Sequence, residues 1–206
     1  CAALSDELRK KMGETAVKAA RAAGYTNAGT VEFLLEKDGT FYFMEMNTRI
    51  QVEHPVTECV TGIDLIKEQI RIANGGELTF RQEDIRMTGH AIECRINAEI
   101  PERNFMPSAG RITDLHLPGG NGIRVDTAVY SGCEVLPYYD SMLAKLIVHG
   151  KDRREAVDKM RSALGEIIIE GIGTNVDYQY EISENEDFIS GKTDVDFIRR
   201  LSSETA

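Results

Sequence analysis

The sequence predicts an α+β fold in which an antiparallel sheet with helices on one side is followed by a smaller mixed domain. Helical periodicity covers residues 5–24 and 151–169, far apart in the chain. Strand-like runs flank an Asp38-Gly39 turn, and the stretch from about Gly89 is rich in glycine and proline between short alternating runs. Helices and strands that are segregated along the chain, rather than regularly alternating, are typical of α+β domains.

The first helix is expected over residues 5–24. Ser5 is a suitable N-cap, Asp6 and Glu7 would lie in the first turn, and Gly24 can end the helix. Apolar side chains recur every three or four residues, at Leu8, Met12, Ala16, Ala19 and Ala23. This spacing is that of an amphipathic helix.

Residues 30–47, TVEFLLEKDGTFYFMEMN, predict two antiparallel strands joined by the turn Lys37-Asp38-Gly39. An extended stretch then runs up to Pro55. Residues 56–76 predict one or two short helices, with Gly62 as a break between them and Gly75-Gly76 as a stop.

The pattern changes from about Gly89, and we place a domain boundary between residues 1–88 and 89–206. The alternation in HAIECRINAE predicts a strand, and residues 107–150 predict several short strands. A helix is expected over residues 151–169. Its inward side chains would be Ala156, Met160, Ala163 (or Leu164) and Ile167.

Composition excludes several classes of protein. A net charge of -10 gives no general nucleic-acid footprint. No apolar run approaches the roughly 20 residues of a membrane span, and no signal-peptide pattern appears. The four cysteines and four histidines are scattered, so we expect free thiols in a reducing compartment rather than a zinc site or disulfides. A chain that begins at Cys1 is expected to be processed or part of a longer one.

Polar side chains alternate through MEMNTRIQVEH, residues 44–54. If the segment is extended throughout, Met44, Met46, Ile50 and Val52 lie on one face. The first face would anchor the segment in a core. The opposite face, which would line a cleft, carries Glu45, Asn47, Arg49, Gln51 and Glu53. A solvated strand face is the ordinary interpretation of such a pattern.

Three features favour a binding site instead. The hairpin would bring Glu32 roughly opposite Glu45, and two close carboxylates repel unless a cation lies between them. Asn47 adds a neutral oxygen, which suits a hard cation such as Mg²⁺. Arg49, Gln51 and Glu53 continue into a loop before Pro55, and loops often display site residues. A guanidinium beside a metal ion, here that of Arg49, indicates phosphate chemistry.

Longer motifs, in order along the chain, closely resemble the biotin carboxylase family of ATP-grasp enzymes. They are EMNTRIQVEHPVTE, GIDLIKEQIRIANG, TGHAIECRINAEIP, FMPSAGRI, LPGGNGIRVD, YYDSMLAKLIVHGKDRREAV and EGIGTNVDYQ. The resemblance covers nearly all of the chain. It implies that residues 1–88 are the C-terminal part of an ATP-grasp domain and that residues 89–206 are the biotin carboxylase C-terminal domain.

The resemblance also implies a nucleotide and metal site. Two divalent ions, Mg²⁺ or Mn²⁺, would be held on the ATP phosphates by Glu32 and Glu45 with help from Asn47. Leu34 and Met44 would line the adenine pocket, although for both an ordinary core position is the alternative. The expected ATP-binding residues are therefore Glu32, Leu34, Met44, Glu45 and Ile172.

Bicarbonate and biotin are the other substrates that the resemblance implies. Arg49 would pair with bicarbonate, Gln51 and the Val52 backbone would orient it, and Glu53 would be the general base. Arg95 would contact biotin and stabilise its enolate oxygen. Bicarbonate would attack the γ-phosphate of ATP to give carboxyphosphate and ADP. The carboxyphosphate would then deliver CO₂ to N1 of the biotin on a carrier protein.

The family's enzyme is more than twice this long, so the chain alone is expected to be nearly inactive without the missing N-terminal part. Expected partners are the biotin carboxyl carrier protein, a carboxyltransferase subunit or domain, and a second copy in a homodimer. Asn121 stands where the family's dimer loop can carry a bulky residue, which argues against the same dimer. The expected location is the cytoplasm, or the mitochondrial matrix or plastid of a eukaryote.

Two alternatives remain open. One is another ATP-grasp ligase of the carbamoyl-phosphate type, which shares the E-M-N-x-R motif but uses ammonia and carbamate. The run from Gly89 to Tyr178 argues against it. The other is a non-catalytic module for assembly within a carboxylase complex.

Overall fold

The computed structural model describes residues 4–204. The chain divides into two compact units, Cys1–Met87 and Thr88–Ala206. The second unit is the larger, so the expectation of a smaller second domain is wrong. No helix among the described residues is long and apolar enough to cross a membrane.

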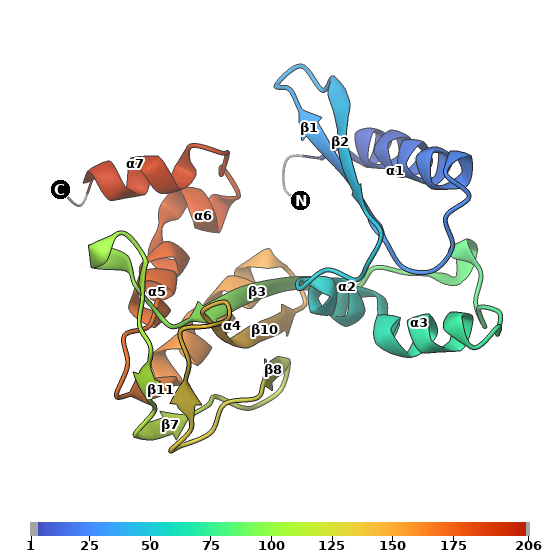
Figure 1. The fold of residues 1–206 in the computed structure, drawn as a ribbon. Helices are drawn as coiled ribbons and strands as arrows, with labels where there is room; N and C mark the ends of the chain where they lie inside the picture. Colours follow the sequence, from blue (N-terminus) through green and yellow to red (C-terminus); the bar gives the residue numbers. More distant parts are fainter. Residues whose placement is uncertain (1–3, 205–206) are drawn as a thin grey trace. The chain divides into compact units, whose positions relative to one another are not determined.

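The first unit combines helices with a β-hairpin (Figure 1). Its elements are α1 (Asp6–Ala22), β1 (Thr30–Leu35), β2 (Phe41–Asn47), α2 (His54–Thr61), α3 (Leu65–Ala73) and the 3₁₀ helix η1 (Gln82–Asp84). Ser5 caps α1 by accepting a hydrogen bond from the Leu8 backbone N–H. Gly62 ends α2 in the left-handed conformation, which glycine adopts at little cost. The helix signals in the sequence therefore correspond to real helix ends.

The hairpin of β1 and β2 has the expected turn and register. Gly39 adopts a positive φ of 86° in the turn. Glu32 is the register partner of Glu45, and a β-bulge follows between Glu32 and Phe33. The sequence prediction that these two carboxylates face each other is confirmed.

The segment of residues 44–54 is not extended throughout, and the loop expected before Pro55 is found. β2 ends at Asn47, and α2 begins at His54. Pro55 lies in the first turn of α2, where its fixed φ favours a helix start. Gln51, Val52 and Glu53 are therefore displayed by a loop and not by alternation along a strand.

The first unit has almost no core of its own. Among its described residues only Pro55 is buried, and the expectation that the apolar face of residues 44–52 lies in a core is wrong for Met44, which is 48 % exposed. Phe33 and Phe41 pack edge to face at 5.3 Å, and the Lys11 ammonium lies 5.6 Å from the centre of the Phe41 ring. A two-stranded hairpin with so little buried apolar surface is marginally stable.

We therefore expect the hairpin amides to exchange with solvent much faster than the amides of the second unit. In native-state hydrogen exchange, β1 and β2 should open on the order of tenfold or more readily than the central strand of the second unit. Equal protection in the two places would show that the hairpin is stabilised by contacts absent from this structure.

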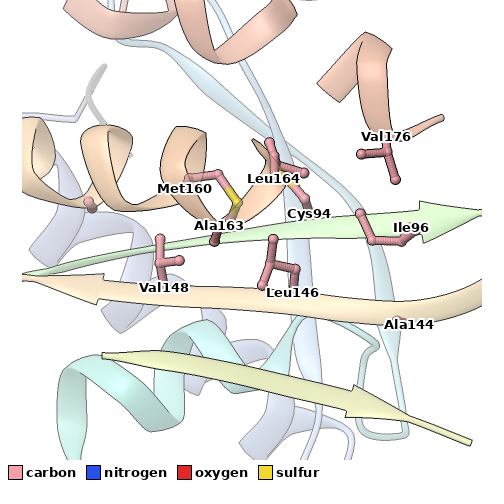
Figure 2. Packing of buried hydrophobic residues seen from close by; sticks show 10 residues of the cluster. Cys94, Ile96, Ala144, Leu146, Val148, Met160, Ala163, Leu164 and Val176 are labelled. Carbon is pink, nitrogen blue, oxygen red and sulfur yellow. The ribbon is translucent and has the colours of Figure 1, made fainter. Parts of the chain in front are cut away.

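The second unit is built on the three-stranded antiparallel sheet β3–β10–β8. β10 (Met142–Gly150) is the central strand, between β3 (His90–Asn97) and β8 (Ile123–Thr127). α4 (Arg153–Glu166) packs against β10 and β3 (Figure 2). The buried cluster comprises Cys94, Ile96, Ala144, Leu146, Val148, Ala156, Met160, Ala163, Leu164 and Val176. The inward positions predicted for Ala156, Met160, Ala163 and Leu164 are confirmed. The expected helix end at residue 169 is wrong, because α4 ends at Glu166 and half-buried Ile167 follows the helix.

Short strand pairs and helices complete the second unit. The antiparallel pairs are β4 (Glu99–Ile100) with β5 (Met106–Pro107), β6 (Gly110–Arg111) with β9 (Glu134–Val135), and β7 (Asp114–His116) with β11 (Ile168–Glu170). The remaining elements are η2 (Pro101–Arg103), α5 (Val176–Glu184), α6 (Glu186–Ser190) and α7 (Phe197–Glu204). Cys94 and Cys133 are free thiols, and burial raises the pKa of Cys94 to about 12. Cys1 lies outside the described residues.

Candidate functional site

Two carboxylates of the hairpin are joined by a single amide nitrogen. Asn47 Nδ2 donates to Glu32 Oε1 at 2.7 Å and to Glu45 Oε1 at 3.0 Å. Gln51 Nε2 donates to the same Glu32 oxygen at 2.9 Å. The carboxylate oxygens of two strands thus converge on one point, and the side chains just beyond β2 fold back onto it.

This arrangement fits a hard divalent cation. Carboxylate and amide oxygens are the ligands that Mg²⁺ prefers, and Glu32, Glu45 and Asn47 supply both kinds. Among residues 4–204 no group of three or more His, Cys, Asp or Glu side chains is arranged to hold a metal ion. A cation at this pair would therefore complete its shell with water or with the oxygens of a bound anion, as Mg²⁺ does in nucleotide sites.

Arg49 and Gln51 place anion-binding donors beside the carboxylate pair. Arg49 is exposed, with Nη2 3.5 Å from Asn47 Oδ1 and Nη1 donating to the Ile50 carbonyl at 3.0 Å. Gln51 is half-buried. A guanidinium and an amide together can hold a small planar anion through several hydrogen bonds.

Val52 and Glu53 follow directly, at the start of α2. Glu53 is exposed and is the N-terminal flanking residue of the helix, but its side chain makes no capping hydrogen bond. His54 Nδ1 lies 2.8 Å from the Gln51 carbonyl, which holds the loop in place. His54 therefore bonds to a backbone carbonyl.

Leu34 and Met44 lie on the hairpin that carries the carboxylates. Their exposed fractions are 60 % and 48 %, so the alternative that they are ordinary core residues is wrong within this chain. Exposed apolar side chains beside a polar cluster are typical of a binding surface.

Arg95 and Ile172 belong to the second unit and are described within it. Arg95 is exposed on β3, opposite Lys145 of β10. Buried Asn175 fixes the backbone there, because its Nδ2 donates to the Arg95 carbonyl at 3.0 Å and its Oδ1 accepts from the Asn97 N–H at 2.8 Å. Sequence reasoning missed this role of Asn175. Ile172 is half-buried.

Lys145 belongs to an ion-pair cluster with Asp126 and Arg124. Arg124 donates twice to Asp126, at 2.8 Å in each bond, and Lys145 Nζ lies 3.5 Å from the same carboxylate. The hydrogen bonds from Arg124 are the main reason why the pKa of Asp126 is lowered. Lys145 thus joins β10 to β8 through an ion pair, while Tyr138 and Tyr139 are exposed.

Two family models match the chain. Residues 93–200 match the biotin carboxylase C-terminal domain, and residues 1–81 match the ATP-binding domain of the carbamoyl-phosphate synthase L chain. The first match covers the part of the chain that distinguishes these two kinds of ATP-grasp enzyme.

Similar proteins carry consistent names. The chain is 57 % identical over 197 residues to biotin carboxylase 1 of Bacillus subtilis. This match covers 95 % of this chain and 44 % of the relative. It is 52 % identical over 200 residues to the biotin carboxylase of a Nostoc species, covering 97 % of this chain and 45 % of the relative. The chain thus spans less than half the length of these curated relatives.

A solved structure agrees in fold. It is the biotin carboxylase domain dimer of Hydrogenobacter thermophilus 2-oxoglutarate carboxylase in complex with MgADP, ADP and bicarbonate. The TM-score is 0.95 at 50 % identity, over 97 % of this chain and 44 % of that one. The predicted α+β class, with part of an ATP-grasp domain followed by a biotin carboxylase C-terminal domain, is confirmed. The chain belongs to the biotin carboxylase family.

Proposed function

We propose that this chain is the C-terminal part of a biotin carboxylase, which uses ATP and bicarbonate to carboxylate the biotin of a carrier protein. Residues 1–88 contribute the end of the ATP-grasp domain, and residues 89–206 form the C-terminal domain. The observation that carries the proposal is the Glu32–Glu45 pair, bridged by Asn47 and flanked by Arg49, in a family where a relative binds MgADP and bicarbonate.

Glu32, Glu45 and Asn47 hold Mg²⁺ or Mn²⁺ on the ATP phosphates. A divalent ion at this place neutralises phosphate charge during phosphoryl transfer. Leu34 and Met44 supply apolar surface for the adenine, which explains why they are exposed on the carboxylate-bearing hairpin. Ile172 is a further nucleotide contact, contributed by the second unit.

Arg49, Gln51 and Val52 bind and orient bicarbonate, and Glu53 takes its proton as it attacks the γ-phosphate. The exposed carboxylate of Glu53 suits a base that must meet an incoming substrate. Arg95 stabilises the enolate oxygen of biotin, because a fixed cation favours charge that develops in the transition state. Carboxyphosphate is the species that delivers CO₂ to biotin.

The partners follow from this role. They are the biotin carboxyl carrier protein, a carboxyltransferase subunit or domain, and the N-terminal portion found in longer relatives. A homodimer is also proposed, because the biotin carboxylase domain of the relative is a dimer. The proposed location is the cytoplasm, or the mitochondrial matrix or plastid of a eukaryote.

The test is bicarbonate-dependent ADP release with Mg-ATP and free biotin. We expect the chain alone to release little ADP, because the part of its relatives that it does not span would be needed to enclose the phosphates. Adding the N-terminal portion of a relative in trans should restore release. No activity in either mixture, with the chain shown to be folded, would favour a non-catalytic assembly role.

A further inference from the structure

A continuous set of hydrogen bonds connects the carboxylate pair to both anion-binding donors. Asn47 Nδ2 faces Glu32 and Glu45, while Asn47 Oδ1 faces the Arg49 guanidinium at 3.5 Å. Gln51 Nε2 is engaged by Glu32 Oε1 at 2.9 Å. In this structure the two side chains proposed to bind bicarbonate are therefore turned toward the carboxylates and toward the Asn47 amide.

The side-chain amide of asparagine carries its nitrogen and its oxygen on opposite sides, so it presents only one of them to a given neighbour. Nδ2 faces the carboxylates here because it can donate to them, whereas Oδ1 in that place would repel them. With a cation between the carboxylates the preference is reversed, because a cation binds oxygen and repels the N–H groups. Asn47 must then turn its amide, and Oδ1 leaves Arg49.

The contacts of Glu32 Oε1 also indicate that a cation would rearrange the neighbouring side chains. It accepts from Asn47 at 2.7 Å and from Gln51 at 2.9 Å. A carboxylate oxygen that ligates a cation has little capacity left for two amide donors. Gln51 is therefore released from Glu32 and its Nε2 becomes available to another acceptor.

We propose that Asn47 and Gln51 couple the cation site to the bicarbonate site, so that each ligand increases the affinity of the other. The inference rests on the proposed function, which assigns the cation to Glu32 and Glu45 and bicarbonate to Arg49 and Gln51. When the carboxylates hold a cation, Arg49 and Gln51 no longer bond to Asn47 and Glu32 and can turn to the anion. The coupling is reciprocal, as any linkage of two binding equilibria must be.

Simple attraction between a cation and a nearby anion also predicts mutual enhancement. The two explanations differ at Gln51, which is uncharged. Removing its side chain leaves the charges in place but removes the hydrogen bond that must be exchanged. The coupling factor in Gln51→Ala therefore separates rearrangement from charge attraction.

The test uses this chain with the probes Mg²⁺ and ¹³C-bicarbonate. Bicarbonate dissociation constants are measured by NMR titration without Mg²⁺ and at saturating Mg²⁺, and Mg²⁺ constants with and without bicarbonate. We expect Mg²⁺ to lower the bicarbonate constant by about fivefold or more, a typical coupling between sites, with the same factor in the reverse experiment. The side-chain amide signals of Asn47 and Gln51 should both shift on addition of Mg²⁺ alone.

Two variants and the exchange of Mg²⁺ for Mn²⁺ distinguish side-chain rearrangement from charge attraction and from absence of the site. In Gln51→Ala the coupling factor should fall clearly below the wild-type factor, while exposed Gln82→Ala, the matched control, should keep the wild-type factor. Full coupling in Gln51→Ala would overturn the proposal in favour of charge attraction. Mn²⁺ in place of Mg²⁺ should broaden the signal of bound bicarbonate if the sites adjoin. Broadening with a coupling factor of one would overturn the coupling alone, and absence of bicarbonate binding would overturn the proposed site with it.

Discussion

Glu53→Gln is expected to lower bicarbonate-dependent ADP release by about 10²–10⁴-fold in the chain complemented with the N-terminal portion, because this is the usual contribution of a general base. The substitution keeps the size and shape of the side chain and removes its ability to accept a proton. It should not disturb the start of α2, because the Glu53 side chain makes no capping hydrogen bond there. The measurement is the steady-state rate at saturating Mg-ATP and bicarbonate.

The control is Glu77→Gln, which changes another exposed glutamate of the same unit, outside the site. Its rate should equal that of the unsubstituted chain, and circular dichroism should show the same helix content for both variants. If Glu53→Gln retained most of the activity, the base would have to be another group. If both variants lost activity equally, a general effect of lowered negative charge would explain the loss.

The hairpin shows how much of this site the sequence could predict. The Asp38-Gly39 turn and the alternation around it are local signals, and together they place Glu32 opposite Glu45, as found. Beyond Asn47 the alternation argument fails, since Pro55 favours a helix start and the strand has already ended. Gln51, Val52 and Glu53 are displayed on a loop because of the helix start at Pro55, which the alternation of polar and apolar residues does not indicate.

The second unit shows which structural features local sequence patterns cannot predict. The inward face of α4 follows from helical periodicity, which depends only on neighbours in the chain. The central position of β10 depends on which distant strands pair with it, and this is a property of the whole sheet. Asn175 was missed for the same reason, since its partners at Arg95 and Asn97 are about eighty residues away.

Leu146→Ala is expected to lower the free energy of unfolding of the second unit by about 3 kcal/mol, within the usual range for a buried leucine. Leu146 is fully buried in the cluster between the sheet and α4 (Figure 2), so its removal leaves a cavity that the surrounding side chains fill only in part. Such a loss is a large fraction of the stability of an ordinary domain. Urea denaturation followed by circular dichroism measures it.

Val195→Ala is the matched control, because Val195 is fully exposed and its truncation should change the unfolding free energy by no more than about 0.5 kcal/mol. A loss below about 1 kcal/mol for Leu146→Ala would mean that the cluster is more loosely packed than described.

The expected loss of stability at Leu146 also bears on function. Leu146 is the register partner of Cys94, next to Arg95 on β3, so a cavity at Leu146 weakens the strand that positions the proposed biotin contact. In the chain complemented with the N-terminal portion, we therefore expect the Leu146→Ala variant to lose biotin-dependent turnover at temperatures below its unfolding midpoint.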